Sequence, residues 1–139
     1  MKAFLFRFWQ WTWGLPQSLI GFIIYLAHKD APHRTYHGCI VTKWKQSGSL
    51  GVGMFLFLSE RSYDRESDVQ VHEFGHAVQS AILGPLFLLI MGIPSFLWCN
   101  LPPCRKLRRE KGISYYRFYP ESNANCLGSL VAKEPCNLK

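Results

Sequence analysis

The sequence lacks several features that define common protein classes. Its five cysteines are odd in number and show no C-x-x-C spacing, so they do not suit a disulfide framework or a zinc knuckle. No run of about 20 uninterrupted apolar residues is present, which is the length that a simple transmembrane helix needs. The chain also lacks internal repeats and low-complexity segments. These absences exclude a disulfide-stapled secreted scaffold and a repeat protein, and they predict reduced thiols in a cytosolic setting.

Charge is unevenly distributed in this chain of 139 residues, which has a net charge of +7. The length suits a single domain, 1–139. Residues 28–81 balance acidic and basic side chains, whereas Lys2, Arg7 and the segment 105–111 hold the basic excess. Basic residues beside apolar segments indicate contact with anionic lipid headgroups. Nucleic acid is the competing interpretation of such a cluster, but no recognition module accompanies it, so we expect no nucleic-acid partner.

Two hydrophobic segments, 1–28 and 82–104, predict association with a membrane. The first is interrupted by polar residues and by Gly14 and Pro16, and no small-residue cleavage site follows it, which favours a retained segment. The second is too short for two helical crossings, so we expect it to be re-entrant, interfacial or buried in the protein. We therefore expect attachment to the inner or cytoplasmic membrane, with the functional site on the cytoplasmic side.

Residues 72–76 read His-Glu-Phe-Gly-His, the H-E-x-x-H pattern of zinc hydrolases. In that pattern the histidines bind the metal and the glutamate is the general base, which here are His72, His76 and Glu73. A chain of this length contains the pattern by accident in roughly one case in 200. The alternative is that both histidines are ordinary core residues, but Glu73 would then be a buried carboxylate without a partner, which is costly.

Helical periodicity surrounds the motif. Apolar residues recur at helical spacing from Val71 to Ile82, and Gly84 followed by Pro85 is a strong stop signal. Ser67 or Asp68 can cap the start. We therefore expect a metal-bearing helix over residues 67–83.

The preceding region is rich in β-forming residues. Residues 38–45 and 50–58 form two such runs separated by the turn-prone 46–49, which predicts a β-hairpin. Residues 59–68 are charged and predict a loop. The expected fold class is thus α+β, a minimal zincin-like core with a metal-bearing helix, a β-hairpin and membrane-associated hydrophobic helices.

A catalytic zinc needs a third protein ligand, and the sequence offers few. The residues after His76 do not contain the histidine of a metzincin, and the three later glutamates are Glu110, Glu121 and Glu134. Glu110 lies in the basic cluster, and Glu134 precedes a proline in the tail. Glu121 begins a helix-compatible stretch that resembles the E-x-x-A-D element of gluzincin peptidases, with Asn125 at the aspartate position. Its alternative role is that of a carboxylate stabilised by a helix N-terminus.

Taken together, these motifs resemble a bacterial family of small, membrane-associated, gluzincin-like metalloproteins. The matching segments are 13–17, 72–76, 79–80, 83–86, 92–95, 113–119 and 121–128, and the similarity extends from about residue 9 to 131. The departures are Asn125, where the family has an acid, and the small polar pair Ser122 and Asn123. The resemblance implies a zinc peptidase-like protein but no particular substrate.

We expect Zn²⁺ on His72, His76 and Glu121, with Glu73 as the base in hydrolysis of a peptide or protein substrate at or near the membrane. Asn125 is expected to orient a ligand histidine without supplying charge. Tyr115, Tyr116 and Tyr119 are equal candidates for stabilising the oxyanion. The alternative function is a non-catalytic membrane protein that keeps a structural or vestigial zinc site and acts through protein contacts.

Overall fold

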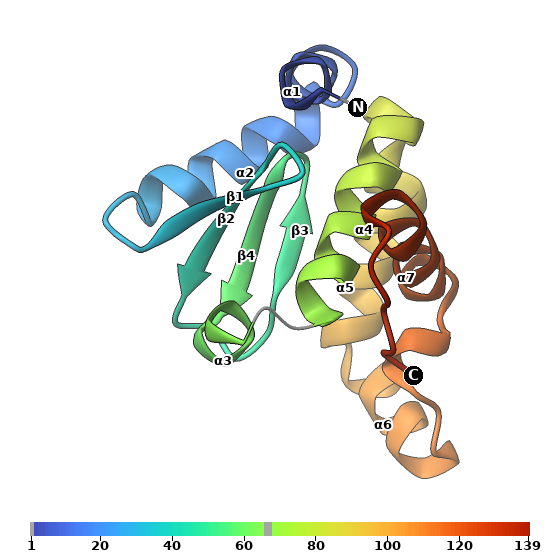
Figure 1. Ribbon diagram of the computed structural model, residues 1–139. Helices are drawn as coiled ribbons and strands as arrows, with labels where there is room; N and C mark the ends of the chain where they lie inside the picture. Colours follow the sequence, from blue (N-terminus) through green and yellow to red (C-terminus); the bar gives the residue numbers. More distant parts are fainter. Residues whose placement is uncertain (1, 66–67) are drawn as a thin grey trace.

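The computed structural model describes residues 2–65 and 68–139 and has an α+β fold (Figure 1). The helices are α1 (Ala3–Thr12), α2 (Leu15–Ala27), α3 (Glu60–Asp64), α4 (Asp68–Leu83), α5 (Ile93–Asn100), α6 (Pro102–Lys111) and α7 (Tyr119–Ala132). The strands are β1 (His33–Tyr36), β2 (Cys39–Trp44), β3 (Leu50–Val52) and β4 (Phe55–Ser59). Short 3-10 or π turns form η1 (Gly84–Leu86), η2 (Leu88–Gly92) and η3 (Tyr115–Arg117). The sheet lies on one side of α4, and α7 lies on the other (Figure 1).

The four strands form a mixed sheet in the order β1-β2-β4-β3. The predicted hairpin between 38–45 and 50–58 is wrong, because β2 and β4 pair in parallel. The run 50–58 is divided by a two-residue turn at Gly53 and Met54, which makes β3 and β4 an antiparallel hairpin. Gly53 has φ +61°, a conformation that glycine adopts without strain. A second hairpin, β1 with β2, turns at His37 and Gly38, both with positive φ, as two-residue hairpin turns require.

The segment 59–68, predicted to be a loop, contains the short helix α3. Ser59 caps this helix, since its hydroxyl accepts a hydrogen bond from the backbone N–H of Ser62. In residues 60–64 the charged composition is that of a short helix with no buried residue.

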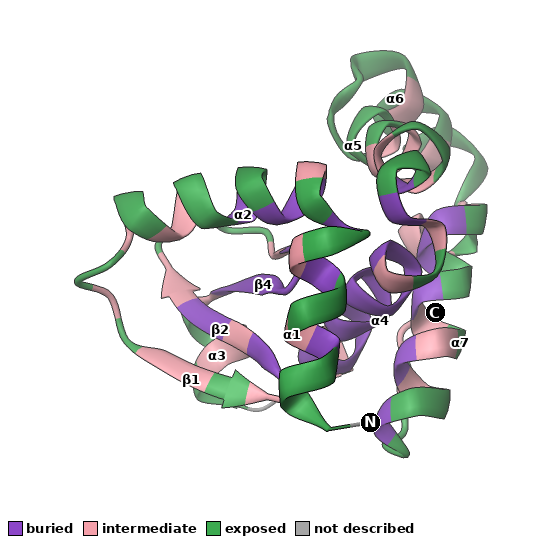
Figure 2. Cartoon of the chain, turned by 90° about the horizontal axis from the view of Figure 1, so that it is seen from above, coloured by how far each residue is buried: buried purple, intermediate pink, exposed green. Residues whose placement is uncertain are grey.

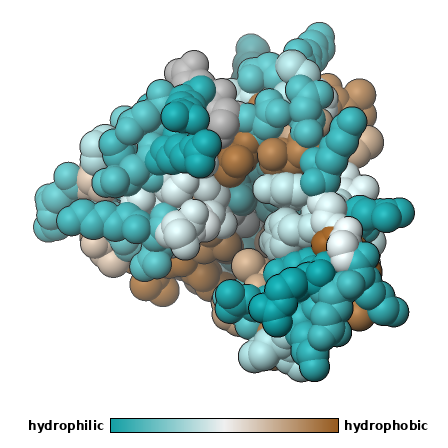
Figure 3. All heavy atoms as spheres, turned by 90° about the horizontal axis from the view of Figure 1, so that it is seen from below, coloured by the Kyte–Doolittle hydropathy of each residue, from teal (hydrophilic) through white to brown (hydrophobic). Residues whose placement is uncertain are grey.

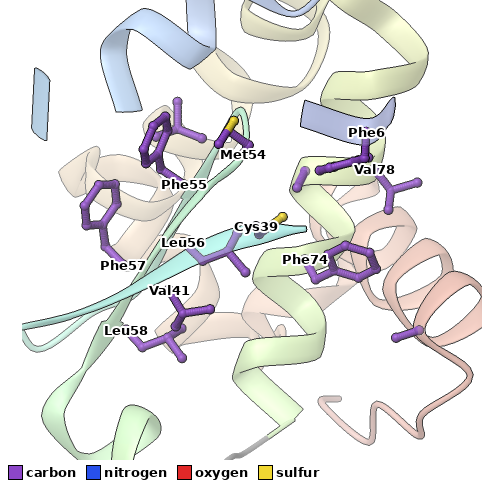
Figure 4. Close-up of a cluster of buried hydrophobic side chains, with 13 residues drawn as sticks. Phe6, Cys39, Val41, Met54, Phe55, Leu56, Phe57, Leu58, Phe74 and Val78 are labelled. Carbon is purple, nitrogen blue, oxygen red and sulfur yellow. The ribbon is translucent and has the colours of Figure 1, made fainter. Parts of the chain in front are cut away.

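The hydrophobic core lies where the sheet meets α4 (Figure 4). Phe55, Leu56, Phe57 and Leu58 are all buried, so both faces of β4 are covered. A central strand with two covered faces has a continuous apolar sequence rather than an alternating one. Phe74 of α4 packs against this core.

Helix α4 spans Asp68–Leu83, in agreement with the predicted 67–83, although the proposed cap Ser67 lies outside the described residues. The helix ends where Gly84 adopts φ +54° beneath the Trp13 indole. A Cβ atom at Gly84 would come within 2.3 Å of that ring, so glycine is required for both reasons.

The N-terminal helices hold the C-terminal end of α4 through buried amides. Gln10 Nε2 donates to the carbonyl oxygen of Ala77 at 2.8 Å, and Gln17 Nε2 donates to that of Gly84 at 3.0 Å. Ser80 Oγ connects the two glutamines, since it donates to Gln10 and accepts from Gln17. These bonds join α1 to the second half of α4 and α2 to the residue that follows it.

Helices α4 and α7 approach each other closely because small residues face each other. A Cβ atom on Gly75 would lie 1.9 Å from the carbonyl oxygen of Ala124. A Cβ atom on Gly128 would lie 2.1 Å from that of Val71. The glycine inside the H-E-x-x-H motif therefore has a packing role, which is to bring α7 against α4.

Between these two helices the chain reverses through η1, η2 and α5. The axis of Leu88–Asn100 is bent by 119° from that of Asp68–Leu86. Among the described residues no single helix has the length and hydropathy to cross a membrane, and this bent pair passes that test only when taken together. The reversal lets α7 return to α4 and places its first turn opposite the two histidines.

Candidate metal centre

His72 and His76 lie one turn apart on α4, with their ring centroids 4.8 Å apart. Both imidazoles and the Glu73 carboxylate between them in sequence are buried. A potential ligand atom from each of these three residues lies within 4.8 Å of the other two. The helix thus brings together, in one buried place, three side chains of types that can bind a metal.

Glu121, in the first turn of α7, reaches the same place from the opposite side. Its Oε2 atom lies 3.1 Å from His72 Nε2 and 3.5 Å from His76 Nε2, and the residue is fully buried. The other two late glutamates lie elsewhere: Glu110 is 3.8 Å from Lys106, and Glu134 is 3.5 Å from His37. Of the three, Glu121 is the one that meets the motif.

Asn125, one turn after Glu121, holds the ring of His72. His72 Nδ1 donates to Asn125 Oδ1 at 2.6 Å. The orientation of the amide is fixed because its Nδ2 donates to the carbonyl oxygen of Leu138 at 3.1 Å. Cys136 Sγ also lies 3.3 Å from Asn125 Oδ1.

Gln79 does the same for His76, which the sequence analysis did not identify. His76 Nδ1 donates to Gln79 Oε1 at 2.8 Å, while Gln79 Nε2 donates to the Pro120 carbonyl oxygen and to Asn123 Oδ1. A buried glutamine three residues after a ligand histidine is the available sequence signal, because positions i and i+3 are neighbours on a helix.

These partners determine which ring nitrogen faces the centre. An amide oxygen only accepts hydrogen bonds, so Nδ1 of His72 and of His76 must each carry a proton. In the neutral tautomer each Nε2 therefore presents a lone pair toward Glu121 Oε2, which is itself buried without a hydrogen-bond partner. Three electron-pair donors converge on one point, and this arrangement fits a cation such as Zn²⁺.

Ser95 of α5 completes the surroundings of Glu121. Its hydroxyl donates to Glu121 Oε1, the oxygen that does not face the histidines. The segment 82–104 thus contributes a side chain to the site, a function that sequence analysis did not assign to it. Ser95 leaves Oε2 as the oxygen available to a metal.

The electrostatics of the buried groups follow from this geometry. Burial would raise the pKa of Glu121, but the approach of His72 and His76 lowers it well below its usual range. Burial alone would lower the pKa of His76, but the carboxylates of Glu121 and Glu73 raise it. Burial raises the pKa of Glu73, an effect that the two imidazoles only partly offset. The surroundings therefore shift the pKa values of the Glu73 and Glu121 carboxyl groups in opposite directions.

Strand β3 lies directly against α4 at Gly51. A Cβ atom there would come within 2.5 Å of the carbonyl oxygen of Glu73 and 3.0 Å of its Oε2. A hydrogen bond from the Gly51 backbone to Glu73 partly stabilises the ionised carboxylate. Glycine at this position lets the end strand of the sheet reach the site.

The three candidate tyrosines are not equivalent. Tyr119 donates its hydroxyl to the carbonyl oxygen of Ile90 and is half exposed. Tyr115 and Tyr116 line the cleft, and the Tyr116 ring lies 5.1 Å from that of His72. Burial raises the pKa of Tyr116 to about 12 and that of Tyr115 further, so both hydroxyls keep their protons and can donate. The geometry therefore favours Tyr115 or Tyr116 over Tyr119.

A cleft of about 750 Å³ leads to these residues. Strand β3 forms one wall, η2 and α5 form the other, and His72, Glu73 and His76 lie at the bottom. Seen from below, the molecule is hollowed between two lobes, and apolar atoms lie in and beside the hollow (Figure 3). The volume is within the range of small-molecule and peptide sites.

Comparison with known proteins finds no match, so the interpretation of the site rests on its geometry. No protein family model matches the chain, and neither the curated proteins nor the solved structures contain a match.

Proposed function

We propose that this protein is a zinc-dependent peptidase of the gluzincin type that acts at a membrane surface. The observation that carries the proposal is the convergence of His72 Nε2, His76 Nε2 and Glu121 Oε2, with both Nδ1 atoms held by amide oxygens. The resemblance of the sequence to membrane-associated gluzincin-like proteins supports the same assignment.

His72, His76 and Glu121 would hold the ion, and Ser95, Asn125 and Gln79 would keep these ligands in place. Zinc, when bound, supplies a Lewis acid that polarises a carbonyl group and acidifies water. With Glu121 as the third ligand, Glu73 remains available as a base.

Glu73 would accept a proton from the attacking water and deliver it to the departing amine nitrogen. Its raised pKa suits this role, because a carboxylate in a desolvated site is a stronger base than one in water. Tyr115 or Tyr116 would donate a hydrogen bond to the carbonyl oxygen as negative charge develops on it.

The substrate we propose is an extended peptide. Strand β3 is the last strand of the described sheet, and it forms one wall of the cleft beside Glu73. An added strand would bond to the free edge of β3 and carry its peptide groups past the site.

Membrane attachment is part of this proposal. Exposed apolar side chains on α1 and α2 include Phe4, Phe8 and Ile23, and further ones lie on η2 and α5. Basic side chains at 105–111 would contact anionic lipid on the cytoplasmic face.

The test is zinc analysis of detergent-purified wild type, Glu73→Gln and Glu121→Gln, with Glu110→Gln as a matched surface control. We expect about one zinc per chain in wild type, Glu73→Gln and the control, and a large loss in Glu121→Gln. Peptide hydrolysis should occur in wild type and the control and disappear in Glu73→Gln.

Two other results would contradict parts of this proposal. Loss of zinc in Glu73→Gln would make Glu73 a ligand and not the base, in line with its position beside both histidines. A wild type that binds zinc without cleaving any peptide would favour the non-catalytic alternative, which the uncharged Asn125 beside His72 supports.

A further inference from the structure

The described walls of the cleft provide no charged partner for a substrate side chain. Of the described residues that line it, none is lysine, arginine or aspartate, and the acidic one is Glu73 at the bottom. Leu50 and Val52 lie on the β3 side, and Phe87, Leu88 and Phe96 lie opposite. A charged side chain entering this cleft would lose its hydration without gaining an ion pair, which is strongly unfavourable.

The mouth of the cleft merges with the outer apolar surface. Ile20, Ile93 and Phe96 line the cleft and are also 43%, 49% and 64% exposed. From Ile20 the apolar surface continues along α2, and from Ile93 and Phe96 it continues along α5. In Figure 2, α2 and α5 lie on the same side of the layer formed by β4 and α4, with exposed outer faces.

Helix α6 adds positive charge directly after α5. Four of its basic residues are exposed, namely Arg105, Lys106, Arg109 and Lys111. An apolar surface bordered by such a helix is complementary to a bilayer that contains anionic lipids. A soluble protein partner would not require both features around the entrance of the cleft.

We infer that the cleft binds peptide segments with uncharged, apolar side chains that are presented at an anionic bilayer surface. This inference rests on the proposed peptidase function for its substrate class, although binding can be measured without hydrolysis. The terminal turns of membrane-inserted helices and short apolar peptides lying in the interface have this chemistry. The bilayer would then deliver the segment through the opening between α2 and α5.

Zinc-loaded Glu73→Gln protein allows binding to be tested without turnover. Three fluorescent decapeptides with an acyl anchor would differ at one central residue, which is leucine, lysine or aspartate. They would be presented in vesicles of phosphatidylcholine with phosphatidylglycerol, and in vesicles of phosphatidylcholine alone. We expect the leucine peptide to bind about tenfold or more tightly than either charged peptide. Its binding should also be stronger on the vesicles that contain phosphatidylglycerol.

A charge placed at the mouth provides the complementary test. Ile93→Asp, at a half-exposed position, should improve binding of the lysine peptide relative to the leucine peptide by about fivefold or more. Leu130→Asp is the matched control, since Leu130 is 70% exposed on α7 and does not line this cleft. It should leave the order of affinities unchanged.

Equal binding of the three peptides, or no binding of any, would overturn the inferred selectivity. Equal binding on both vesicle types would overturn delivery from an anionic bilayer. Absence of hydrolysis by zinc-loaded wild type would overturn the peptidase proposal alone, because the selectivity is measured in the Glu73→Gln background.

Discussion

Asn125 Oδ1 accepts a hydrogen bond from His72 Nδ1 at 2.6 Å, in the place where a gluzincin would have a carboxylate. The amide fixes the tautomer and the direction of the ring as an acid would. It does not bring a negative charge that would raise the basicity of the ligand. Under the proposed function, the metal ligands would therefore be oriented as in a gluzincin but less strongly polarised.

Replacing Asn125 separates these two effects. Asn125→Leu removes the acceptor and should weaken zinc binding about 10- to 100-fold, whereas Asn125→Asp should strengthen it by roughly tenfold. Competition with a chromogenic chelator measures both constants. If Asn125→Leu binds zinc as tightly as wild type, the orienting role is wrong.

Because α4 and α7 approach closely, we expect one added methyl group between them to have a large effect on stability. Gly75→Ala places a Cβ atom against the Ala124 carbonyl and should lower the free energy of unfolding by about 2–3 kcal/mol. It should also weaken zinc binding, because Glu121 moves away with α7. Gly48→Ala is the control, since a Cβ atom there meets nothing within 4 Å and should change stability by about 0.5 kcal/mol or less. Urea unfolding of the two variants, with and without chelator, tests both statements.

The pKa shifts predict how the metal-free protein responds to pH. The folded-state pKa of His76 is raised above its usual 6.5, so its contribution to stability is present at lower pH and is lost as pH rises through that raised value. The raised pKa of Glu73 acts in the same direction. The pKa of Glu121 is depressed, so its contribution persists on acidification until the pH falls toward that depressed value. Thermal unfolding with chelator should therefore show a lower Tm at about pH 9 than at about pH 6.5.

Zinc binding should depend on pH in the opposite sense. The metal requires a neutral imidazole at His76 and competes with the proton there. Apparent affinity measured by calorimetry should increase from about pH 6 to about pH 8, with proton release on binding. An affinity that is constant over this range would be inconsistent with His76 as a ligand.

Membrane attachment should depend on the charge of α6. Arg109→Gln and Lys111→Gln should each weaken the affinity for phosphatidylglycerol vesicles, measured by sedimentation, by about fivefold. This factor corresponds to about 1 kcal/mol of binding free energy per basic residue. Added salt should weaken binding of the wild type. Lys133→Gln, an exposed substitution after α7, serves as the comparison. Equal loss in the comparison variant would indicate a general charge effect and not a local one.

Local sequence signals were sufficient for α4 but not for the sheet. Helical periodicity and the stop at Gly84 act within one segment, and the predicted limits agree with Asp68–Leu83. The parallel pairing of β2 with β4 depends on contacts between distant residues, and a buried run such as 50–58 does not reveal the turn at Gly53 inside it. The hairpin was therefore assigned to the wrong pair of strands.

The residues of the site also divide into those that local sequence predicts and those that it does not. His72, Glu73 and His76 form a contiguous pattern, and Glu121 could be nominated because few acidic residues follow them. Gln79 offered only its i, i+3 spacing from His76, and Ser95 and Gly51 had no comparable signal, since their roles depend on the bend before α5 and the position of β3. Supporting residues become visible only when the elements that carry them are placed together.

Gln10 bonds to the carbonyl oxygen of Ala77 in α4, next to His76, and Gln17 bonds to that of Gly84 directly after the helix. From His76 to Gly84 a helix advances roughly 12 Å, and these bonds join the two ends of that stretch to α1 and α2. If α1 and α2 lie in the bilayer surface, the fold holds the site at a fixed distance from that surface. It would cut a membrane-bound chain at a set depth, and the position of the scissile bond would be chosen by its height above the lipid as much as by its sequence.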